Sequence, residues 1–400
     1  MRPSARTRVL TGTALVLALS AVTTACGGDT GSSRAGSPGD APAATPSVPV
    51  KDPLVATFDG GLYVLDGTSL KLAATLTAPG FNRVNPAGDH DHVVVSTDKG
   101  FLFLNASKQA FTDIVYEGAK PGHVVRHAGK TALFTDGTGK VEVFDPADLA
   151  GGERPKGRTH TVAVPHHGVA VGLAGGELLT TVGTEEKRTG ALVLDRNDKE
   201  IARAENCPGV HGEAAARGGA VAVGCEDGVL VYKDGAFTKI DAPDAYGRIG
   251  NQAGSPHSPV LLGDYKTDPE AERERPTRVS LIDTGKNRIR LVELGTSYSF
   301  RSLARGPHGE ALVLGTDGRI HVVDPVSGKV AKRIPVVGAW HEPLDWQGAR
   351  PTLFVRGRTA YVSEPGKKAL HAIDLTTGKK VASVSLPRST NELSGVAGDH

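Results

Sequence analysis

The chain returns at intervals of about 30 to 50 residues to one pattern, in which a Gly-rich turn leads into a short apolar strand. The copies are GLYVLDGTSL at 61, GFLFLNASKQ at 100, KVEVFDPADL at 140, GALVLDRNDK at 190, GVLVYKDGAF at 228, RVSLIDTGKN at 278, RIHVVDPVSG at 319 and ALHAIDLTTG at 369. Further apolar segments precede and follow each copy, so every repeat predicts four short antiparallel strands joined by tight turns. The repeats therefore predict an all-β fold, a β-propeller of eight four-stranded blades, with seven blades as the alternative.

The ends of the repeat region predict how the ring closes. The first unit begins at LVATFDGG, already on its second strand, and the last residues, NELSGVAGDH, resemble the inner-strand sequence NRVNPAGDHDH of the second unit. We therefore expect residues near 390–400 to pair with 53–76 and to complete the first blade. The predicted blades are 53–78 with the C-terminus, 81–117, 121–164, 165–205, 207–241, 245–294, 297–336 and 339–386.

The N-terminus predicts export. Arg2, Arg6 and Arg8 precede an apolar stretch from Val9 to Val22, and TTAC follows with Cys26. This order resembles a bacterial lipoprotein signal in which Cys26 is lipidated, although Thr23 stands where Leu or Val is expected. A plain secretory signal is the alternative, and either signal places the protein outside the cytoplasm, as a cell-membrane lipoprotein or a secreted protein.

Composition divides the chain into three parts and limits its partners. Residues 1–26 form the signal segment, 27–50 a flexible linker of Gly, Ser, Pro and Ala, and 51–400 a single propeller domain. The formal net charge is +2, which offers no electrostatic basis for nucleic-acid binding. We expect a monomer that contacts a membrane only through a lipid anchor. The charged turn KTDPEAERERP at 266–276 is interpreted as a solvated loop.

Two cysteines, Cys207 and Cys225, remain in the propeller region. A hairpin folded about Ala216 places residue 207 opposite residue 225, and an oxidising compartment favours a disulfide between them. Two thiolate ligands of a zinc site are the alternative. A disulfide here would hold the hairpin from which His211 projects.

Histidines recur at the beginning of predicted inner strands. His123, His167 and His211 each lie about eight to ten residues before the second strand of three consecutive blades, and His341 lies about eleven before that of the eighth. Because the inner strands of a propeller begin at the same channel mouth, these imidazoles are predicted to converge as zinc ligands. Copper and nickel are alternative metals. The carboxylates that could complete the site are Glu213, Glu342 and Asp345.

A second set of histidines lies near the turns at the opposite end of the predicted channel. Its members are His90, His127, His257, His308 and His400. Polar residues are common in such turns, so turn chemistry explains the set without a metal. The sequence DHDH at 89–92, with His90 and His92, is the candidate within it for a weaker metal site.

Two short sequences, PHHGVAV at 165–171 and CPGVHGEAA at 207–215, together with the paired cysteines and an exported propeller, resemble the AztD-type zinc metallochaperones. The resemblance implies a zinc-binding chaperone that delivers zinc to the solute-binding protein of a zinc ABC importer. It implies zinc ligation by His167 and His211, whereas His123 and His341 follow from their register. Residues 27–50 contain no histidine, unlike the His-rich mobile segment of that family.

Two other classes of function remain as alternatives. One is a propeller scaffold or binding lipoprotein at the cell surface without metal. The other is an enzyme, but the tryptophan docking motifs of quinoprotein propellers are absent, since the chain has only Trp340 and Trp346. No Ser/His/Asp pattern or phosphate-binding loop is found, and a metal-dependent hydrolase would need Glu213 as its base. We predict that the protein is not an enzyme.

Overall fold

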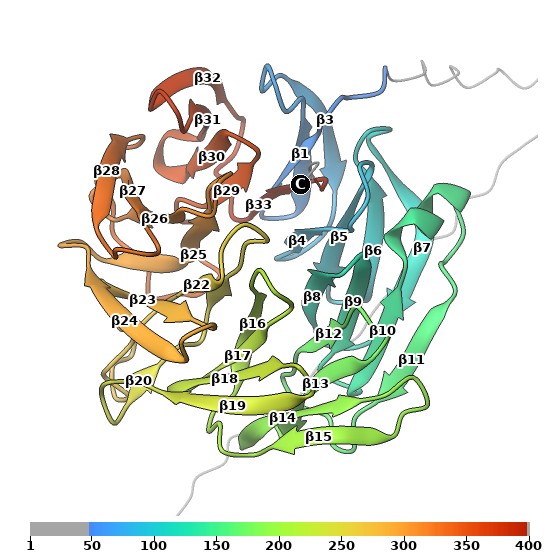
Figure 1. Cartoon of the computed structure of the whole chain (residues 1–400). Helices are drawn as coiled ribbons and strands as arrows, with labels where there is room; N and C mark the ends of the chain where they lie inside the picture. Colours follow the sequence, from blue (N-terminus) through green and yellow to red (C-terminus); the bar gives the residue numbers. More distant parts are fainter. Residues whose placement is uncertain (1–47, 398–400) are drawn as a thin grey trace, which may run out of the picture. The chain divides into compact units, whose positions relative to one another are not determined.

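A ring of eight antiparallel sheets forms the part of the chain that the computed structural model describes, residues 48–397 (Figure 1). Each predicted blade range, with the C-terminus counted in the first, encloses the four main strands of one sheet, and the prediction of eight blades is confirmed. The predicted signal segment with Cys26, and nearly all of the predicted linker, lie outside the described residues.

The strands are given from the innermost to the outermost of each blade. Blades 1 to 4 contain β33 (Leu393–Gly395), β1 (Leu54–Phe58), β2 (Gly61–Leu65) and β3 (Leu72–Thr77); β4 (Arg83–Pro86), β5 (His92–Thr97), β6 (Gly100–Asn105) and β7 (Ala110–Glu117); β8 (Pro121–His127), β9 (Lys130–Thr135), β10 (Lys140–Phe144) and β11 (Gly157–Thr161); and β12 (Ala170–Gly172), β13 (Leu178–Gly183), β14 (Arg188–Leu194) and β15 (Glu200–Ala204).

Blades 5 to 8 contain β16 (His211–Ala215), β17 (Val221–Cys225), β18 (Asp227–Lys233) and β19 (Ala236–Asp241); β21 (Gln252–Ala253), β22 (Val260–Gly263), β23 (Arg278–Asp283) and β24 (Arg288–Glu293); β25 (Tyr298–Arg305), β26 (Ala311–Gly315), β27 (Arg319–Val323) and β28 (Val330–Pro335); and β29 (Leu353–Arg356), β30 (Thr359–Glu364), β31 (Ala369–Asp374) and β32 (Lys379–Ser385). The short strand β20 (Gly247–Arg248) pairs with β18, although its residues were predicted to belong to blade 6.

Burial along each blade follows from its place in the ring. Both faces of a middle strand such as β17 pack against neighbouring blades, and all its residues are buried. The outermost strand of a blade, such as β19, alternates between exposed and partly or fully buried residues because one of its faces meets water. The hydrophobic clusters therefore extend from one blade to the next; one of them joins Val125, Val193 and Val223, from blades 3, 4 and 5.

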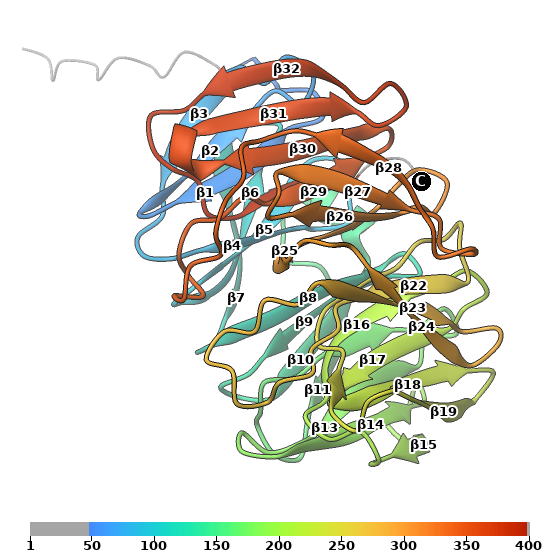
Figure 2. The ribbon, with the colours of Figure 1, turned by 90° about the vertical axis from the view of Figure 1, so that its left-hand side faces the viewer.

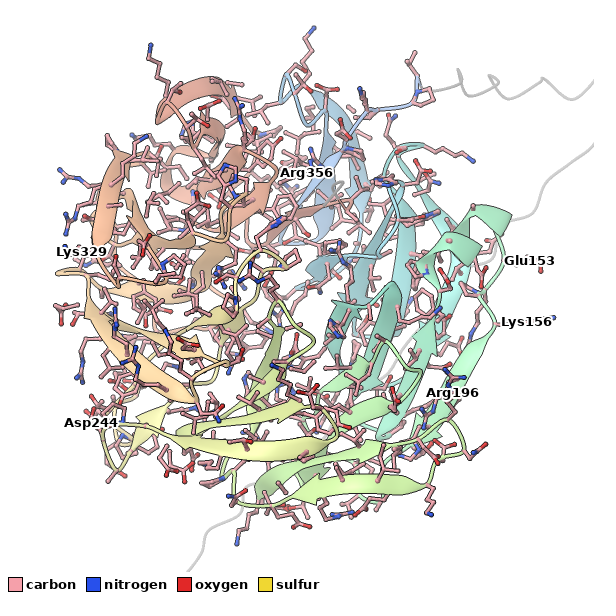
Figure 3. All side chains as sticks on the ribbon, viewed as in Figure 1. Glu153, Lys156, Arg196, Asp244, Lys329 and Arg356 are labelled. Atoms are coloured by element: carbon pink, nitrogen blue, oxygen red, sulfur yellow. A yellow bond between two sulfur atoms is a disulfide. The ribbon has the colours of Figure 1, made fainter. Side chains whose placement is uncertain are left out.

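Figure 2 shows this layering from the side, with β29, β30, β31 and β32 lying edge to edge in blade 8. Figure 3 labels Glu153, Lys156 and Lys329, whose charged side chains lie at the outer edge of the ring. Two short 3-10 helices, η1 (Pro146–Gly151) and η2 (Pro365–Lys367), interrupt the strands. Within residues 48–397, no helix has the length and apolar character needed to cross a membrane.

The ring closes as the sequence predicts. β33 pairs with β1 in antiparallel register, with Leu54 opposite Gly395 and Ala56 opposite Leu393. Leu393 and Val396 are buried, so the closing strand also fills the core between its neighbours. The C-terminal residues thus supply the inner strand that the first repeat lacks.

The charged turn at 266–276 is more than a solvated loop. Its residues are largely exposed, but Arg273 donates a hydrogen bond to the carbonyl oxygen of Leu344 and Arg275 donates one to that of Glu342. These bonds join blade 6 to the loop that precedes β29 in blade 8. A sequence pattern records the charge of such a turn but not the carbonyl groups it meets.

Candidate metal centre

Three histidines from three consecutive blades meet at the face where their inner strands begin. His123 lies in β8, His167 shortly precedes β12 and His211 is the first residue of β16. One potential ligand atom from each lies within 4.8 Å of the other two. The ring centroids are 5.0 to 5.3 Å apart. We refer to these residues as the three-histidine cluster.

Irregular strand pairing turns His211 into the cluster. The register between β16 and β17 shifts between His211 and Glu213, and Gly212 between them has a φ of +68°. A Cβ atom at Gly212 would lie 2.5 Å from the side-chain oxygen of Gln252 and 2.7 Å from the carbonyl oxygen of Gly250. Glycine is therefore required on both conformational and steric grounds. Such bulges are a common means of re-aiming a side chain at a site.

Hydrogen bonds determine which ring nitrogens are free to bind a metal. Nδ1 of His211 lies 2.5 Å from the carbonyl oxygen of Gly250, and Nδ1 of His167 lies 2.5 Å from Oδ2 of Asp136. A carbonyl and a carboxylate can only accept, so both Nδ1 atoms carry the proton when the rings are neutral. The Nε2 atoms of His167 and His211 then hold lone pairs, and they face each other at 3.0 Å.

Two facing lone pairs at this distance repel each other unless a cation lies beside them. A shared proton or a metal ion would remove the repulsion. Nitrogen ligands about 2.0–2.1 Å from a tetrahedral zinc are separated by roughly 3.3 Å, close to the observed 3.0 Å between the Nε2 atoms of His167 and His211. The donor set therefore fits zinc.

Burial favours the neutral form of His211, which a metal requires. Burial, followed by the neighbouring His123 and His167, holds the pKa of His211 well below its usual value. The side chain of His167 is 42% exposed, whereas that of His123 is 18% exposed, so the cluster is open on one side. A competing ligand can approach from that side.

Glu213 is the carboxylate that the sequence predicted and that lies near the cluster. Its Oε2 is 3.4 Å from Nδ1 of His123, and its side chain is 20% exposed. The other two predicted carboxylates have different partners: Glu342 pairs with Arg350 at 3.2 Å, and Asp345 accepts a hydrogen bond from the backbone of Gln347. Burial raises the pKa of Glu342. Glu213 is therefore the candidate for a fourth ligand or for a group that orients His123.

Sequence reasoning missed Asp136. It lies in the sequence TDGTGK between β9 and β10, which reads as an ordinary turn. Its carboxylate accepts from His167 and, at 3.4 Å, from the backbone nitrogen of Gly168. Only the fold brings this turn of blade 3 against the first residues of blade 4.

The fourth predicted ligand, His341, and the histidine next to His167, His166, have different surroundings. His341 is exposed on the loop before β29 and does not belong to the three-histidine cluster. His166, adjacent to His167, is buried, with Nδ1 2.8 Å from the carbonyl oxygen of Val164 and Nε2 3.0 Å from Oγ1 of Thr181. Burial lowers the pKa of His166. Of these two adjacent histidines, His166 has a structural role and His167 belongs to the three-histidine cluster.

The sequence DHDH at 89–92 forms a turn rather than a second cluster. His92 is buried, with Nδ1 2.6 Å from Asp89 and Nε2 3.2 Å from the side-chain nitrogen of Asn105. Nδ1 of His90 lies 3.1 Å from the carbonyl oxygen of Ala397, and His400 lies outside the described residues. Across residues 48–397, the three-histidine cluster is the only group of three His, Cys, Asp or Glu residues with converging ligand atoms.

The disulfide between Cys207 and Cys225 is present, and both residues are fully buried. The bond spans the hairpin that carries His211, whose strand partner Gly224 is adjacent to Cys225. The backbone nitrogen of Cys207 also donates to Thr189 at 3.0 Å. These contacts hold the segment that leads to His211.

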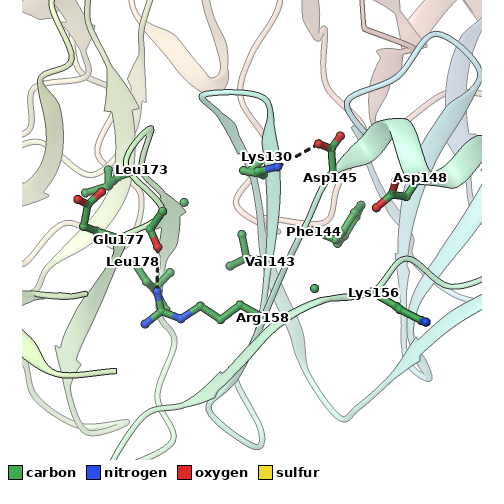
Figure 4. Close-up of a pocket in the computed structure, with 13 residues that line it drawn as sticks. Lys130, Val143, Phe144, Asp145, Asp148, Lys156, Arg158, Leu173, Glu177 and Leu178 are labelled. Carbon is green, nitrogen blue, oxygen red and sulfur yellow. Dashed lines mark hydrogen bonds and ion pairs between the residues drawn. The ribbon is translucent and has the colours of Figure 1, made fainter. Parts of the chain in front are cut away.

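The pocket drawn in Figure 4 is not part of the candidate metal centre. It has a volume of about 430 Å³ and lies between blades 3 and 4, near the start of β9 and the end of β12. Lys130 and Asp145, which form an ion pair at 3.0 Å, both line the pocket, and so does Arg158. No histidine lines it, so it is separate from the cluster.

Fold and site together define an eight-bladed propeller with a candidate metal centre made of imidazoles from adjacent blades. In sequence, the chain is 26% identical over 319 residues to the zinc chaperone AztD of Citrobacter koseri, covering 77% of this chain and 72% of that protein. The resemblance to AztD-type proteins is confirmed by this similarity. No family model matches the chain.

Solved structures show the same fold. The crystal structure of Citrobacter koseri AztD has a TM-score of 0.73 at 22% identity, covering 87% of this chain and 98% of that one. A structure of apo AztD from Citrobacter koseri gives a TM-score of 0.71 with the same coverage. The dihydro-heme d1 dehydrogenase NirN, in complex with DHE, is more distant, with a TM-score of 0.56 at 13% identity over 88% of this chain and 76% of that one.

Proposed function

We propose that the protein is an extracytoplasmic zinc chaperone. It holds one zinc ion with the three-histidine cluster and delivers the ion to the solute-binding protein of a zinc ABC importer. The observation that carries the proposal is the 3.0 Å distance between Nε2 of His167 and Nε2 of His211. In each of these rings the other nitrogen, Nδ1, faces a group that can only accept a hydrogen bond. The similarity to a zinc chaperone supports zinc over copper or nickel.

The geometry suits a carrier that must also release its ion. Three neutral imidazoles bind zinc and leave a fourth position for water, Glu213 or an incoming ligand. Because His167 is 42% exposed, ligands of an acceptor can reach the ion before the last histidine has dissociated. Transfer then proceeds by stepwise ligand exchange, without a free zinc ion.

The test is zinc content and competitive zinc affinity of the protein purified without a polyhistidine tag. We expect one equivalent of tightly bound zinc in the wild type and a large loss of affinity in His211→Ala. His308→Ala is the matched control, because His308 is exposed on a turn outside the cluster. Absence of zinc binding by the wild type would instead favour the metal-free scaffold function.

Delivery needs its own measurement. Zinc-loaded protein is mixed with the zinc-free solute-binding protein of a zinc importer in the presence of a chelator that captures released zinc. Direct transfer predicts that the acceptor is filled faster than the chelator is. If the acceptor filled at the same rate from this protein as from a zinc–chelator buffer with the same free zinc concentration, direct delivery would be contradicted.

Export through a lipoprotein signal is part of the proposal. It predicts a lipid-modified Cys26 at the mature N-terminus and release of the protein from membranes by Cys26→Ser. Mass spectrometry of the mature N-terminal peptide distinguishes this from cleavage at a plain secretory signal. The buried disulfide agrees with an oxidising compartment.

A further inference from the structure

Blade 6 supplies no ligand to the three-histidine cluster, yet it holds the imidazole ring of His211 in place. Nδ1 of His211 lies 2.5 Å from the carbonyl oxygen of Gly250, in the segment between β20 and β21. Both flanking strands are only two residues long, so regular strand pairing does little to fix the orientation of this peptide. Another interaction must hold the carbonyl toward the histidine.

A buried carboxylate provides that interaction. Asp264 follows β22 and is 3% exposed. Its Oδ1 accepts hydrogen bonds from the backbone nitrogens of Gly250 at 2.7 Å and Asn251 at 3.0 Å. The backbone nitrogen of Asp264 donates in return to the carbonyl oxygen of Asn251 at 2.9 Å.

Keeping a carboxylate here is costly. Burial raises the pKa of Asp264, and its nearest cation, Lys266, is 3.9 Å away. A buried charge persists where hydrogen bonds compensate its lost hydration, and here those bonds come from one short backbone segment. The bonds to this segment are the evident role of the charge.

The geometry of the peptide bond converts this contact into an orientation of the metal ligand. In a planar trans peptide, the carbonyl of one residue and the N–H of the next point in opposite directions. Asp264 holds the N–H of Asn251, so the carbonyl of Gly250 in the same peptide must point away from Asp264, toward His211. If this peptide rotated, Nδ1 of His211 would lose its acceptor, and Nε2 would no longer be held as the lone-pair nitrogen.

We propose that Asp264 is a positioning residue of the zinc site, which aims the Gly250 carbonyl at Nδ1 of His211 and thereby presents Nε2 of His211 to the metal. The proposal rests on the proposed function in that the cluster binds zinc. Partners that orient a ligating histidine commonly contribute about 10- to 100-fold to metal affinity. The site accordingly extends over blades 3 to 6, one blade beyond its ligands.

The first experiment compares zinc affinities, by chelator competition, of wild type, Asp264→Ala and Asp264→Asn. We expect Asp264→Ala to weaken binding by about 10- to 100-fold and to change the ligand-field spectrum of the cobalt-substituted protein. Asp264→Asn retains a side-chain oxygen acceptor and should restore most of the affinity. Wild-type affinity and an unchanged cobalt spectrum in Asp264→Ala would overturn the proposal.

Glu364→Ala is the matched control. Glu364 is 9% exposed and likewise accepts a backbone hydrogen bond, from Gly338 at 3.1 Å, but it lies in blade 8 and contacts His371 instead of the cluster. We expect this variant to lower the melting temperature without changing zinc affinity by more than about threefold, well short of the effect expected for a positioning residue. An equal loss of affinity in both alanine variants would show a general effect of destabilisation and would contradict the proposal.

A second measurement needs no variant that may fail to fold. In the metal-free wild type above pH 7, nitrogen NMR of the histidine side chains should show His211 with its proton on Nδ1. A proton on Nε2 would refute the orientation. This readout does not depend on zinc binding, so a protein with the expected tautomer but no zinc affinity would refute the proposed function and leave the role of Asp264 in orienting the ring intact.

Discussion

Opposite sides of the propeller use the region around the start of their inner strands for different chemistry. In blades 3 to 5, the segments at the start of the inner strands carry imidazoles whose free nitrogens face one another. Across the ring, the corresponding segments carry buried arginines: Arg301 lies 2.7 Å from Glu392, and Arg350 lies 3.2 Å from Glu342.

The two sides differ in where the hydrogen-bond acceptors lie relative to the arginines and the histidine rings. On the arginine side each carboxylate faces its cation, so the charges are paired within the protein. On the histidine side the acceptors, Asp136 and the Gly250 carbonyl, lie behind the rings and leave the Nε2 atoms unpaired. The same fold thus forms a closed structural cluster on one side and an open ligand set on the other, and residue type decides between them.

The largest effect is expected from removing residues 391–400, which carry both the closing strand and Glu392. The truncation exposes the core that Leu393 and Val396 fill and leaves Arg301 without its carboxylate. Burial of those two side chains alone accounts for about 3–6 kcal/mol. Thermal unfolding should show a sharp fall in melting temperature relative to the wild type. Equal melting temperatures would contradict closure by β33.

Removal of one histidine ligand should weaken zinc binding at the three-histidine cluster. His167→Ala removes one facing Nε2 and should weaken zinc binding by more than about 100-fold, because loss of an orienting partner alone costs up to that amount. His166→Ala is the neighbouring control, since His166 bonds Val164 and Thr181. It should lower stability and leave zinc affinity nearly unchanged. Similar losses of affinity in the two variants would place the ligand set elsewhere.

Breaking a pair on the arginine side should give the reverse result. Glu342→Gln leaves Arg350 buried beside a neutral group, and disruption of a buried pair typically costs about 3–5 kcal/mol. Denaturant unfolding should show this loss, with zinc affinity preserved. A variant with wild-type stability but weakened zinc binding would show that the arginine side and the histidine side are coupled.

A smaller effect is expected from pH. Burial lowers the pKa of His211, so below about pH 6.5 the unfolded chain binds a proton that the metal-free folded protein does not. Stability should therefore decrease as pH falls, by at most about 2 kcal/mol between pH 6.5 and 5 for this residue. Comparison of wild type with His211→Gln by denaturant unfolding isolates the contribution. Zinc affinity should fall over the same range, since protons compete for the ring nitrogens.

Much of the site was predictable because propeller repeats convert sequence register into spatial position. The three histidines precede the second strands of consecutive blades by similar spacings, and the structure brings them together. The same reasoning grouped His341 with them, although it lies exposed on the loop before β29. Register predicts the blade and the face on which a residue lies, but in a long loop it does not predict the direction of the side chain.

The sequence by itself determined the eight four-stranded repeats, the closing C-terminal strand, the cysteine pair and the three histidines, because each depends on local periodicity or on spacing along the chain. Only the tertiary structure decided which nitrogens are free. Asp136, the Gly250 carbonyl and Asp264 come from different blades, and each acts through a hydrogen bond that forms after the blades have packed. Such bonds form only when a donor and an acceptor from distant segments lie about 3 Å apart, within a few tenths of an ångström, and no pattern of residue types records this.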